Sequence, residues 1–289
     1  MFDDIAQTVQ DQTISFYGHD LTIRRLDQIH PQISGNKFFK LKYNLVQAQQ
    51  FGFKKLLTFG GAYSNHIAAT AFAAQYFGFE SLGIIRGQEL QDRPLNPTLK
   101  TALSLGMQLH FVSRQDYRQK SDPAYLQQLQ HKYPDYYVIP EGGTNALAIQ
   151  GCREILQPTD HQYDLICCAV GTGGTITGLI EASQPHQQLL GFSALKGDFL
   201  QHEVAALTTK RNWQIVDDYC CGGYAKTTPE LLQFIQAFEQ QFQIPLEHIY
   251  TGKMLSGLKQ RILNGEIATT TRILAIHSGG LQGRLSIKQ

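Results

Sequence analysis

The residue best placed for covalent chemistry is Lys37, in the run Ser34-Gly35-Asn36-Lys37. This polar, glycine-containing turn leads into Leu41, Leu45 and Ala48, whose spacing predicts one apolar face of a helix. Lys37 should therefore lie in the first turn of that helix, where the dipole and the unpaired N–H groups are positive. A neutral amine, or an amine condensed with a carbonyl, suits that place better than a cation, which indicates a nucleophilic lysine.

A solvated lysine beside Lys40 and Lys42 is the alternative, and on this stretch alone it is the better interpretation. Ser34 or Asn36 can cap the helix, and Gly52 lies where the helix should end. The rest of the chain favours the nucleophile, because it supplies the other parts of a site.

A phosphate-binding loop is indicated by Gly171-Thr172-Gly173-Gly174-Thr175, which joins an expected strand to an expected helix. Glycines let the backbone approach a ligand closely, and the N–H groups of the helix start can hold a phosphate. The dinucleotide fingerprint fails because Ile176 stands where it needs glycine. The ATP-binding loop fails because Gly178 is followed by Leu179. Tight turns also use glycine for geometry alone, so this loop by itself is weak evidence.

A second polar turn, Gly60-Gly61-Ala62-Tyr63-Ser64-Asn65-His66, also joins a strand to a helix. Ser64 and Asn65 can cap that helix, and the same helix end can bind a ligand. Ser64 does not fit a nucleophile elbow, because Ala62 and His66 replace the required glycines. His66 is a possible base, although a lone histidine in a first turn is more often structural. The spacing of the histidines predicts no metal site.

Strands and helices alternate along the chain, which predicts mostly parallel sheets with helices on both faces. Ligands on such sheets bind beyond the carboxyl ends of the strands, where the loops 60–66, 171–174 and 277–280 should lie. The expected strands are 12–16, 21–26, 55–59, 81–85, 108–112, 136–139, 164–170, 189–194, 213–217 and 272–276. Helices are expected after Lys37 and at 67–77, 96–105, 122–131, 145–156, 175–182, 198–207, 229–242 and 252–263.

Composition restricts the partners. The 289 residues include 25 basic and 24 acidic ones, which indicates neither nucleic acid nor an anionic membrane as a partner. No apolar run is long enough to span a membrane, and the first residues do not resemble a signal peptide. The five cysteines predict neither disulfides nor a zinc site, so we expect a cytoplasmic protein.

Six ordered motifs together carry a family resemblance. They are 34–37, 60–66, Pro-Glu-Gly-Gly-Thr-Asn at 140–145, 171–175, Gly-Gly-Tyr-Ala-Lys at 222–226 and His-Ser-Gly-Gly at 277–280. In this order they resemble the 1-aminocyclopropane-1-carboxylate deaminase/D-cysteine desulfhydrase family of tryptophan-synthase-β-like pyridoxal-phosphate enzymes. The resemblance implies fold type II, with two open parallel-sheet α/β domains. We expect residues 40–150 to form the smaller domain, and 1–39 with 151–289 to form the larger, cofactor-binding one.

The resemblance also implies roles for individual residues. Lys37 would form the Schiff base with pyridoxal 5′-phosphate, Asn65 would contact the cofactor's 3′-oxygen, and Ser278 would meet the pyridine nitrogen. Gly171, Thr172, Gly173, Gly174 and Thr175 would hold the phosphate. Ser64 would face the substrate carboxylate, with Asn65, His66 and Tyr224 also near the substrate. Tyr250 would assist proton transfer, and the family suggests a homodimer.

The implied activity is deamination of a small amino acid, with D-cysteine as the preferred substrate. Cyclopropane-opening members carry a tyrosine where this chain has Ala275, so one active-site phenol is expected to be missing. A neutral Ser278 at the pyridine nitrogen also favours β-elimination. The alternatives are 1-aminocyclopropane-1-carboxylate deaminase and, in a different class, a protein that binds pyridoxal phosphate without turnover.

Overall fold

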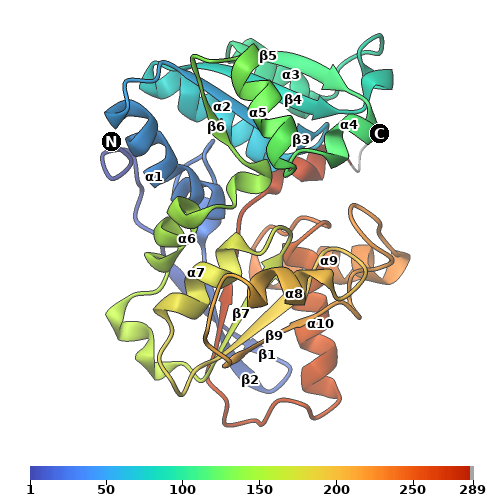
Figure 1. Cartoon of the computed structure of the whole chain (residues 1–289). Helices are drawn as coiled ribbons and strands as arrows, with labels where there is room; N and C mark the ends of the chain where they lie inside the picture. The colour runs from blue at the N-terminus through green and yellow to red at the C-terminus, as the bar shows by residue number, and fades with distance from the viewer. Residues whose placement is uncertain (287–289) are drawn as a thin grey trace.

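Two separate sheets organise the chain in a computed structural model that describes residues 1–286 (Figure 1). The larger sheet has the order β1-β2-β10-β7-β8-β9, and the smaller has the order β5-β4-β3-β6. The strands are β1 Asp11–Phe16, β2 His19–Arg24, β3 Lys55–Gly61, β4 Glu80–Arg86, β5 Met107–Val112, β6 Tyr136–Ile139, β7 Leu165–Val170, β8 Gln188–Ser193, β9 Trp213–Val216 and β10 Ile273–Ile276. The α/β class and the two sheets of fold type II are as the sequence predicted.

Helices cover both faces of each sheet. They are α1 Asn36–Gln50, α2 Asn65–Phe77, α3 Pro97–Ser104, α4 Arg114–Arg118, α5 Pro123–Lys132, α6 Ala146–Arg153, α7 Gly174–Ala182, α8 Phe199–Ala205, α9 Pro229–Phe242 and α10 Thr251–Leu263. Short 3₁₀ turns lie at η1 Leu26–Gln28, η2 Gln88–Leu90, η3 Glu141–Gly143, η4 Pro158–Gln162 and η5 Leu281–Ser286.

Alternating side chains divide the larger sheet's core into two layers. Leu274 and Ile276 of β10 pack with residues of α1, α7 and α8, whereas Ile273 and Ala275 pack with residues of α9 and α10. The smaller sheet is likewise covered by α4 and α5 on one face and by α2 and α3 on the other. Because both faces are buried, the strands carry near-continuous apolar runs, as parallel sheets require.

Every expected strand is present within two residues of its expected bounds, with one difference in direction. β1 pairs antiparallel with β2, while the other strand pairs are parallel. Tyr17 and Gly18, the two turn residues, both have positive φ, at 50° and 85°. Two left-handed residues suit the right-handed twist of a two-residue hairpin.

The start of α1 differs from the expectation. The N-cap is Gly35, and neither Ser34 nor Asn36 caps the helix with its side chain. Ser34 Oγ instead donates to the carbonyl of Asp27. Gly35 has φ 68°, and a Cβ there would lie 1.9 Å from the carbonyl oxygen of Ser278. The close approach of the two backbones therefore requires glycine and sets the entry into α1.

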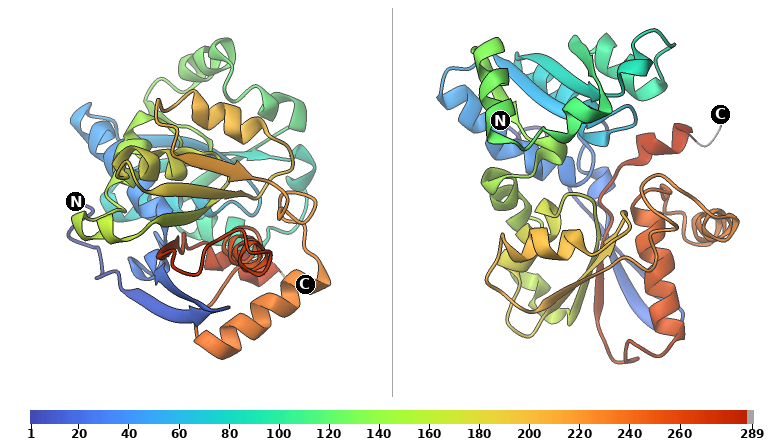
Figure 2. Two further views of the ribbon diagram at one scale, coloured as in Figure 1. Left: turned by 90° about the horizontal axis from the view of Figure 1, so that it is seen from below. Right: turned by 45° about the vertical axis from the view of Figure 1, so that its right-hand side comes forward.

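Segments near both ends of the chain connect the two lobes. The chain leaves β10 in the larger lobe and continues into η5, which contacts α3 of the smaller lobe (Figure 2). Near the N-terminus, Phe2 packs against Phe38 of α1 and Phe77 of α2, with ring centroids 5.0 Å apart in both pairs. The predicted boundary at residue 40 falls inside α1, and the domain limits stay a prediction.

Two further features concern the whole described chain, namely membrane spans and cysteines. Within residues 1–286, no helix is both long and apolar enough to cross a membrane. All five cysteines are free, and four of them, including Cys167 and Cys168, are buried.

Candidate active site

The turn before α1, the loop between β3 and α2, and the loop after β10 lie side by side. The Ser278 carbonyl, just after β10, accepts a hydrogen bond of 3.2 Å from the Asn36 N–H. Gly280 lies so close to Asn65, at the start of α2, that a Cβ on it would be 2.4 Å from the amide nitrogen. The turn before α1, the start of α2 and the end of β10 therefore form one surface, although they are far apart in sequence.

Lys37 is held at that surface by a chain of hydrogen bonds. Its Nζ donates to Asn36 Oδ1 at 3.1 Å, and Asn36 Nδ2 donates to Thr175 Oγ1 at 2.7 Å. Burial, together with the charge of Lys40, lowers the pKa of Lys37 to about 7. A substantial fraction of this amine is therefore neutral near pH 7, as a nucleophile or base requires.

The glycine-rich loop 171–175, called the cradle below, has the geometry of an anion-binding turn at the start of α7. Gly173 is the N-cap with φ 75°, and Thr175 and Gly174 are buried in the first turn. The first-turn N–H groups of a helix have no intrahelical acceptor, and the dipole there favours an anion. Gly171 and Thr172 lead into the turn and are partly exposed.

Lys40 completes the cradle and was missed by the sequence analysis. Its buried Nζ donates to the Gly142 carbonyl, to Thr144 Oγ1 and to Thr172 Oγ1, at 3.0, 3.0 and 3.2 Å. A Cβ on Gly174 would lie 3.2 Å from the same Nζ. Burial lowers the pKa of Lys40 to about 8. The sequence offered one signal: Lys40 follows Lys37 by three residues, and residues three apart lie on the same face of a helix.

Ser64 and Asn65 form the start of α2. Ser64 is the N-cap, and its Oγ accepts from the Ile67 N–H at 3.4 Å, so capping is confirmed for Ser64, whereas Asn65 is the first residue of the helix. Asn65 Oδ1 is buried without a hydrogen-bond partner. A buried polar atom left unpaired is costly, which makes the Asn65 amide a strong candidate for contact with a ligand.

His66 is buried beneath this turn. Thr58 Oγ1 donates to the Ile139 carbonyl at 2.9 Å and so accepts at 2.8 Å from His66 Nε2. The imidazole therefore carries its proton on Nε2, and Nδ1 is a buried acceptor without a partner. Burial, together with the charges of Lys37 and Lys40, lowers the pKa of His66 well below its usual value, so the ring is neutral.

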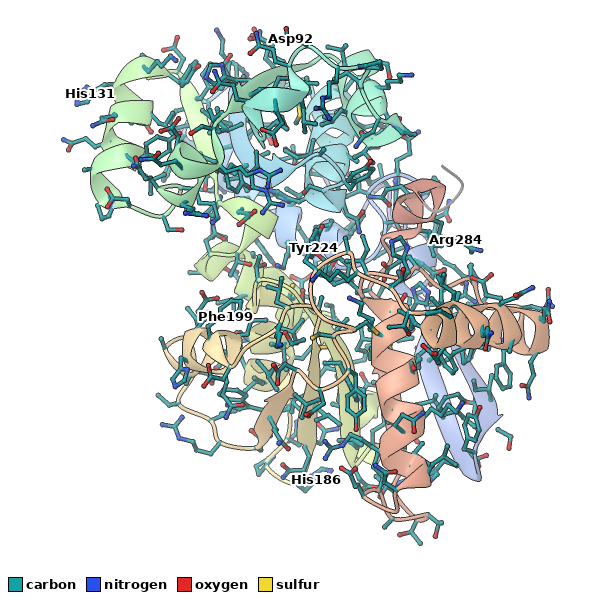
Figure 3. The ribbon with its side chains drawn as sticks, turned by 90° about the vertical axis from the view of Figure 1, so that its right-hand side faces the viewer. Asp92, His131, His186, Phe199, Tyr224 and Arg284 are labelled. Carbon is teal, nitrogen blue, oxygen red and sulfur yellow. The ribbon has the colours of Figure 1, made fainter. Side chains whose placement is uncertain are left out.

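Two tyrosines lie together beside the start of the cradle. The rings of Tyr224 and Tyr250 are 6.1 Å apart in an edge-to-face arrangement, and Tyr224 projects into the region between the lobes (Figure 3). A Cβ on Gly171 would be 3.0 Å from the Tyr250 ring, so that phenol covers the start of the cradle. Burial raises the pKa of Tyr250 well above its usual value, and a hydrogen bond to Tyr224 adds to this. Burial likewise raises the pKa of Tyr224.

The position of Ala275 carries no phenol, and the second phenol of this region comes from another element. Ala275 is fully buried in the β10 core layer, with residues of α9 and α10. Tyr224, in a loop between β9 and α9, supplies the second phenol beside Tyr250. Proximity of a loop to a helix start depends on tertiary structure, so the sequence did not reveal this pairing.

Ala275→Tyr should destabilise the protein, because residue 275 is fully buried. Overpacking a buried site costs about 1–3 kcal/mol or more, because neighbouring side chains and backbone must move. We expect urea denaturation to show this loss in the free energy of unfolding. The exposed Ala268, changed to tyrosine, is the control and should lose little. Equal stability of the two variants would show space beside residue 275.

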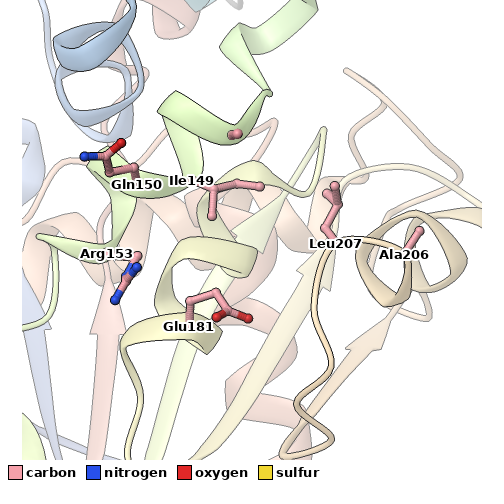
Figure 4. A pocket seen from close by; sticks show the side chains of 7 residues that line it. Ile149, Gln150, Arg153, Glu181, Ala206 and Leu207 are labelled. Atoms are coloured by element: carbon pink, nitrogen blue, oxygen red, sulfur yellow. The ribbon is translucent and has the colours of Figure 1, made fainter.

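A hollow elsewhere on the surface contains none of these residues. It lies over α6, α7 and the end of α8, and Ile149, Arg153, Glu181 and Leu207 are among its lining residues (Figure 4). Within residues 1–286 no group of His, Cys, Asp or Glu side chains is arranged to hold a metal ion.

Comparison with known proteins identifies the class. The crystal structure of a 1-aminocyclopropane-1-carboxylate deaminase homologue matches with a TM-score of 0.85 and 25% identity, covering 98% of this chain and 93% of the other. This places the fold in fold type II. The family model for pyridoxal-phosphate dependent enzymes matches residues 13–279.

Two relatives narrow the family. A Thermotoga maritima protein provisionally named 1-aminocyclopropane-1-carboxylate deaminase is 30% identical, over 92% of this chain and 90% of its own length. A mitochondrial Arabidopsis thaliana protein, a bifunctional D-cysteine desulfhydrase/1-aminocyclopropane-1-carboxylate deaminase, is 31% identical over 92% and 73%. The chain therefore belongs to the pyridoxal-phosphate dependent enzymes, and among them to the 1-aminocyclopropane-1-carboxylate deaminase/D-cysteine desulfhydrase family. It is an enzyme, and its cofactor is pyridoxal phosphate.

Proposed function

We propose that the enzyme is a D-cysteine desulfhydrase, which converts D-cysteine to pyruvate, ammonia and sulfide. The observation that carries this proposal is the position of Lys37. Its amine, with a pKa lowered to about 7, lies one hydrogen-bonded residue away from Thr175 in the cradle. An amine beside a phosphate site is the arrangement needed to attach pyridoxal phosphate and then to handle the substrate's α-proton.

The cofactor would be held by residues that lie around Lys37. Gly171 to Thr175 and the Lys40 ammonium would bind the phosphate, because first-turn N–H groups and a cation both suit a dianion. The unpaired Asn65 amide would contact the cofactor ring, and Ser278 would lie near its nitrogen. When bound, pyridoxal phosphate withdraws electrons from the substrate's α-carbon and weakens the bonds to it.

Lys40→Met should weaken cofactor binding. A hydrogen bond to a charged group contributes about 1.5–3 kcal/mol, so the dissociation constant for pyridoxal phosphate should rise about 10- to 150-fold. Titration of the cofactor-free enzyme, followed by absorbance, measures this. Lys42→Met is the matched control on the same helix, because Lys42 pairs with Asp3 and Glu154. Equal affinity in both variants would remove Lys40 from the phosphate site.

The substrate would be oriented by the start of α2. Ser64 Oγ and the first N–H groups of this helix suit a carboxylate, because the helix dipole is positive there. His66 would act from beneath this turn as a neutral, fixed support. Lys37 would accept the α-proton, and Tyr250 with Tyr224 would protonate the departing sulfur. Phenols with raised pKa values stay protonated at working pH and so can serve as acids.

Opening of 1-aminocyclopropane-1-carboxylate, to 2-oxobutanoate and ammonia, is the second candidate. This substrate has no α-proton, so a carbon–carbon bond must be activated by groups beside the ring. The pair of phenols, Tyr224 and Tyr250, favours this candidate, because together they can supply acid and base. The name of the Arabidopsis relative carries both activities.

The test supplies each substrate to one preparation of the holoenzyme and compares kcat/KM. We expect sulfide and pyruvate from D-cysteine, with slower formation of 2-oxobutanoate from the cyclopropane. Equal or faster turnover of the cyclopropane would transfer the assignment to the second candidate. If neither reacts while the cofactor is bound normally, the substrate is a different amino acid.

We further propose a cytoplasmic homodimer with a smaller domain at residues 40–150. Free thiols at all five cysteines suit a reducing compartment. Strands β3 to β6, all within 40–150, form a sheet of their own, which supports the domain limits. Light scattering after size exclusion measures the mass in solution, and a monomer would contradict the dimer.

A further inference from the structure

Lys253 is a buried lysine for which the activity so far has no use. It lies in the first turn of α10 with 1% of its surface exposed. Its Nζ donates to the carbonyl oxygens of Cys220 and Gly223, at 2.8 Å each. Within residues 1–286 it forms no salt bridge with a carboxylate. An ammonium is costly to bury, so its contacts with these two carbonyls are the feature to explain.

The two carbonyls belong to a loop that is difficult to hold by local interactions. Cys221, Gly222, Gly223 and Ala225 all have positive φ, at 53°, 84°, 125° and 57°. Two of these residues are not glycine, and each such residue in the left-handed region is strained. The backbone hydrogen bonds inside the described loop are short-range turns, such as that from Gly223 N–H to the Cys220 carbonyl at 3.0 Å. The Lys253 ammonium therefore ties a strained loop to a rigid helix.

The same helix positions both phenols. Tyr250 immediately precedes α10, and its N–H donates to the carboxylate of buried Glu247, with the shorter contact at 2.8 Å. Lys253 lies three residues further along and holds the loop on which Tyr224 follows Gly223. The start of α10 thus fixes one phenol through the backbone and the other through an ammonium.

We propose that Lys253 is a positioning residue that sets Tyr224 against Tyr250 and so controls proton delivery by this pair. The proposal rests on the proposed function, in which the phenols protonate the leaving group. Lys253 does not contact the substrate, and its effect on turnover passes through Tyr224. Loss of the ammonium should release the loop 217–226 and separate the phenols while the cradle and Lys37 stay in place.

A double-mutant cycle tests this in the holoenzyme, with whichever of the two substrates reacts faster. Lys253→Met should lower kcat by no more than Tyr224→Phe does, with little change in KM and in cofactor absorbance. In the Tyr224→Phe background, Lys253→Met should cost less than about twofold more, because residues acting through one contact are not additive. Lys253→Arg keeps donors for the carbonyls and should restore part of kcat. Full additivity of the two losses would overturn the proposal.

Lys210→Met is the matched control. Lys210 also donates to three carbonyls, those of Ile180, Glu181 and Ser183, but at the end of α7. This variant should lose stability as Lys253→Met does and keep kcat near the wild-type value. An equal loss of kcat in both would show that Lys253 has only a structural effect.

Hydrogen exchange separates this proposal from the choice of reaction. In Lys253→Met holoenzyme, amide exchange of residues 217–226 should rise at least about tenfold, while the exchange of α7 stays unchanged. Unchanged exchange in the loop would overturn the positioning role whatever the substrate is. Wild-type kcat in Tyr224→Phe would overturn the role of the phenol, and the exchange data would then decide the loop-holding role alone.

Discussion

Lys37→Ala is expected to abolish covalent attachment of pyridoxal phosphate and to lower kcat by about 10²–10⁴-fold or more, because nucleophile and base are lost together. The fold should remain, since Lys37 is the second residue of α1 and lies outside the apolar core of the helix. Attachment is measured by the absorbance of the bound cofactor and by whether the cofactor stays on the protein through dialysis after borohydride reduction.

Mass spectrometry of the reduced wild-type enzyme then locates the cofactor. The modified peptide should carry it on residue 37. Lys40→Met is an informative companion, because it should bind the cofactor more weakly and still attach it to Lys37. Finding the cofactor on Lys40, Lys42 or Lys253 would contradict the assignment of Lys37.

Capture of the cofactor should depend on pH with a midpoint near the lowered pKa of Lys37, about 7. Only the neutral amine reacts, so the rate should rise about tenfold per pH unit below that value and level off above it. Stopped-flow absorbance of cofactor-free enzyme mixed with pyridoxal phosphate measures this. A rate that still rises up to about pH 10 would indicate an ordinary lysine.

The fold could be predicted because most of its strands are short apolar runs, and glycines end several of the helices between them. Such local patterns also gave most helix bounds, for example α9 at 229–242. The short helix α4 was missed, because five residues from Arg114 to Arg118 are too few for periodicity to appear. The predicted cap of α1 was wrong because the N-cap, Gly35, is set by its close approach to the Ser278 carbonyl. Ser278 is far away in sequence, so no local pattern contains this contact.

The site could be predicted only where a residue belongs to a loop with a recognisable sequence. Lys37, Ser64, Asn65 and the cradle lie in such loops, and the structure brings them together. Spacing places Lys40 on the same helix face as Lys37, but its contacts with Thr172 and Gly142 follow only from the packing of α1. Such contacts between elements that are far apart in sequence are set by packing.

The pairing of the phenols was missed for the same reason, and its consequence is the second large effect. Tyr250→Phe should lower kcat for D-cysteine by about 10²–10⁴-fold, because the protonated phenol beside the cradle is lost. Tyr224→Phe should cost less, since Tyr224 is 37% exposed and water can partly replace its hydroxyl. Steady-state kinetics on cofactor-saturated enzyme measures both. Tyr219→Phe, which removes a partly buried phenol next to Phe192, is the control and should leave kcat nearly unchanged.

The double variant reveals how the two hydroxyls act. If Tyr250 protonates the leaving group and Tyr224 only orients it, loss of Tyr224 should add little once Tyr250 is phenylalanine. For the cyclopropane, where acid and base are both needed, each single change should be severe and the ratio between the two substrates should shift toward D-cysteine. Independent, multiplying losses with D-cysteine would mean that both phenols contact the substrate separately. A Tyr250→Phe enzyme with wild-type turnover would instead assign the proton donor to a different group, and Lys37 could then return the proton it has taken.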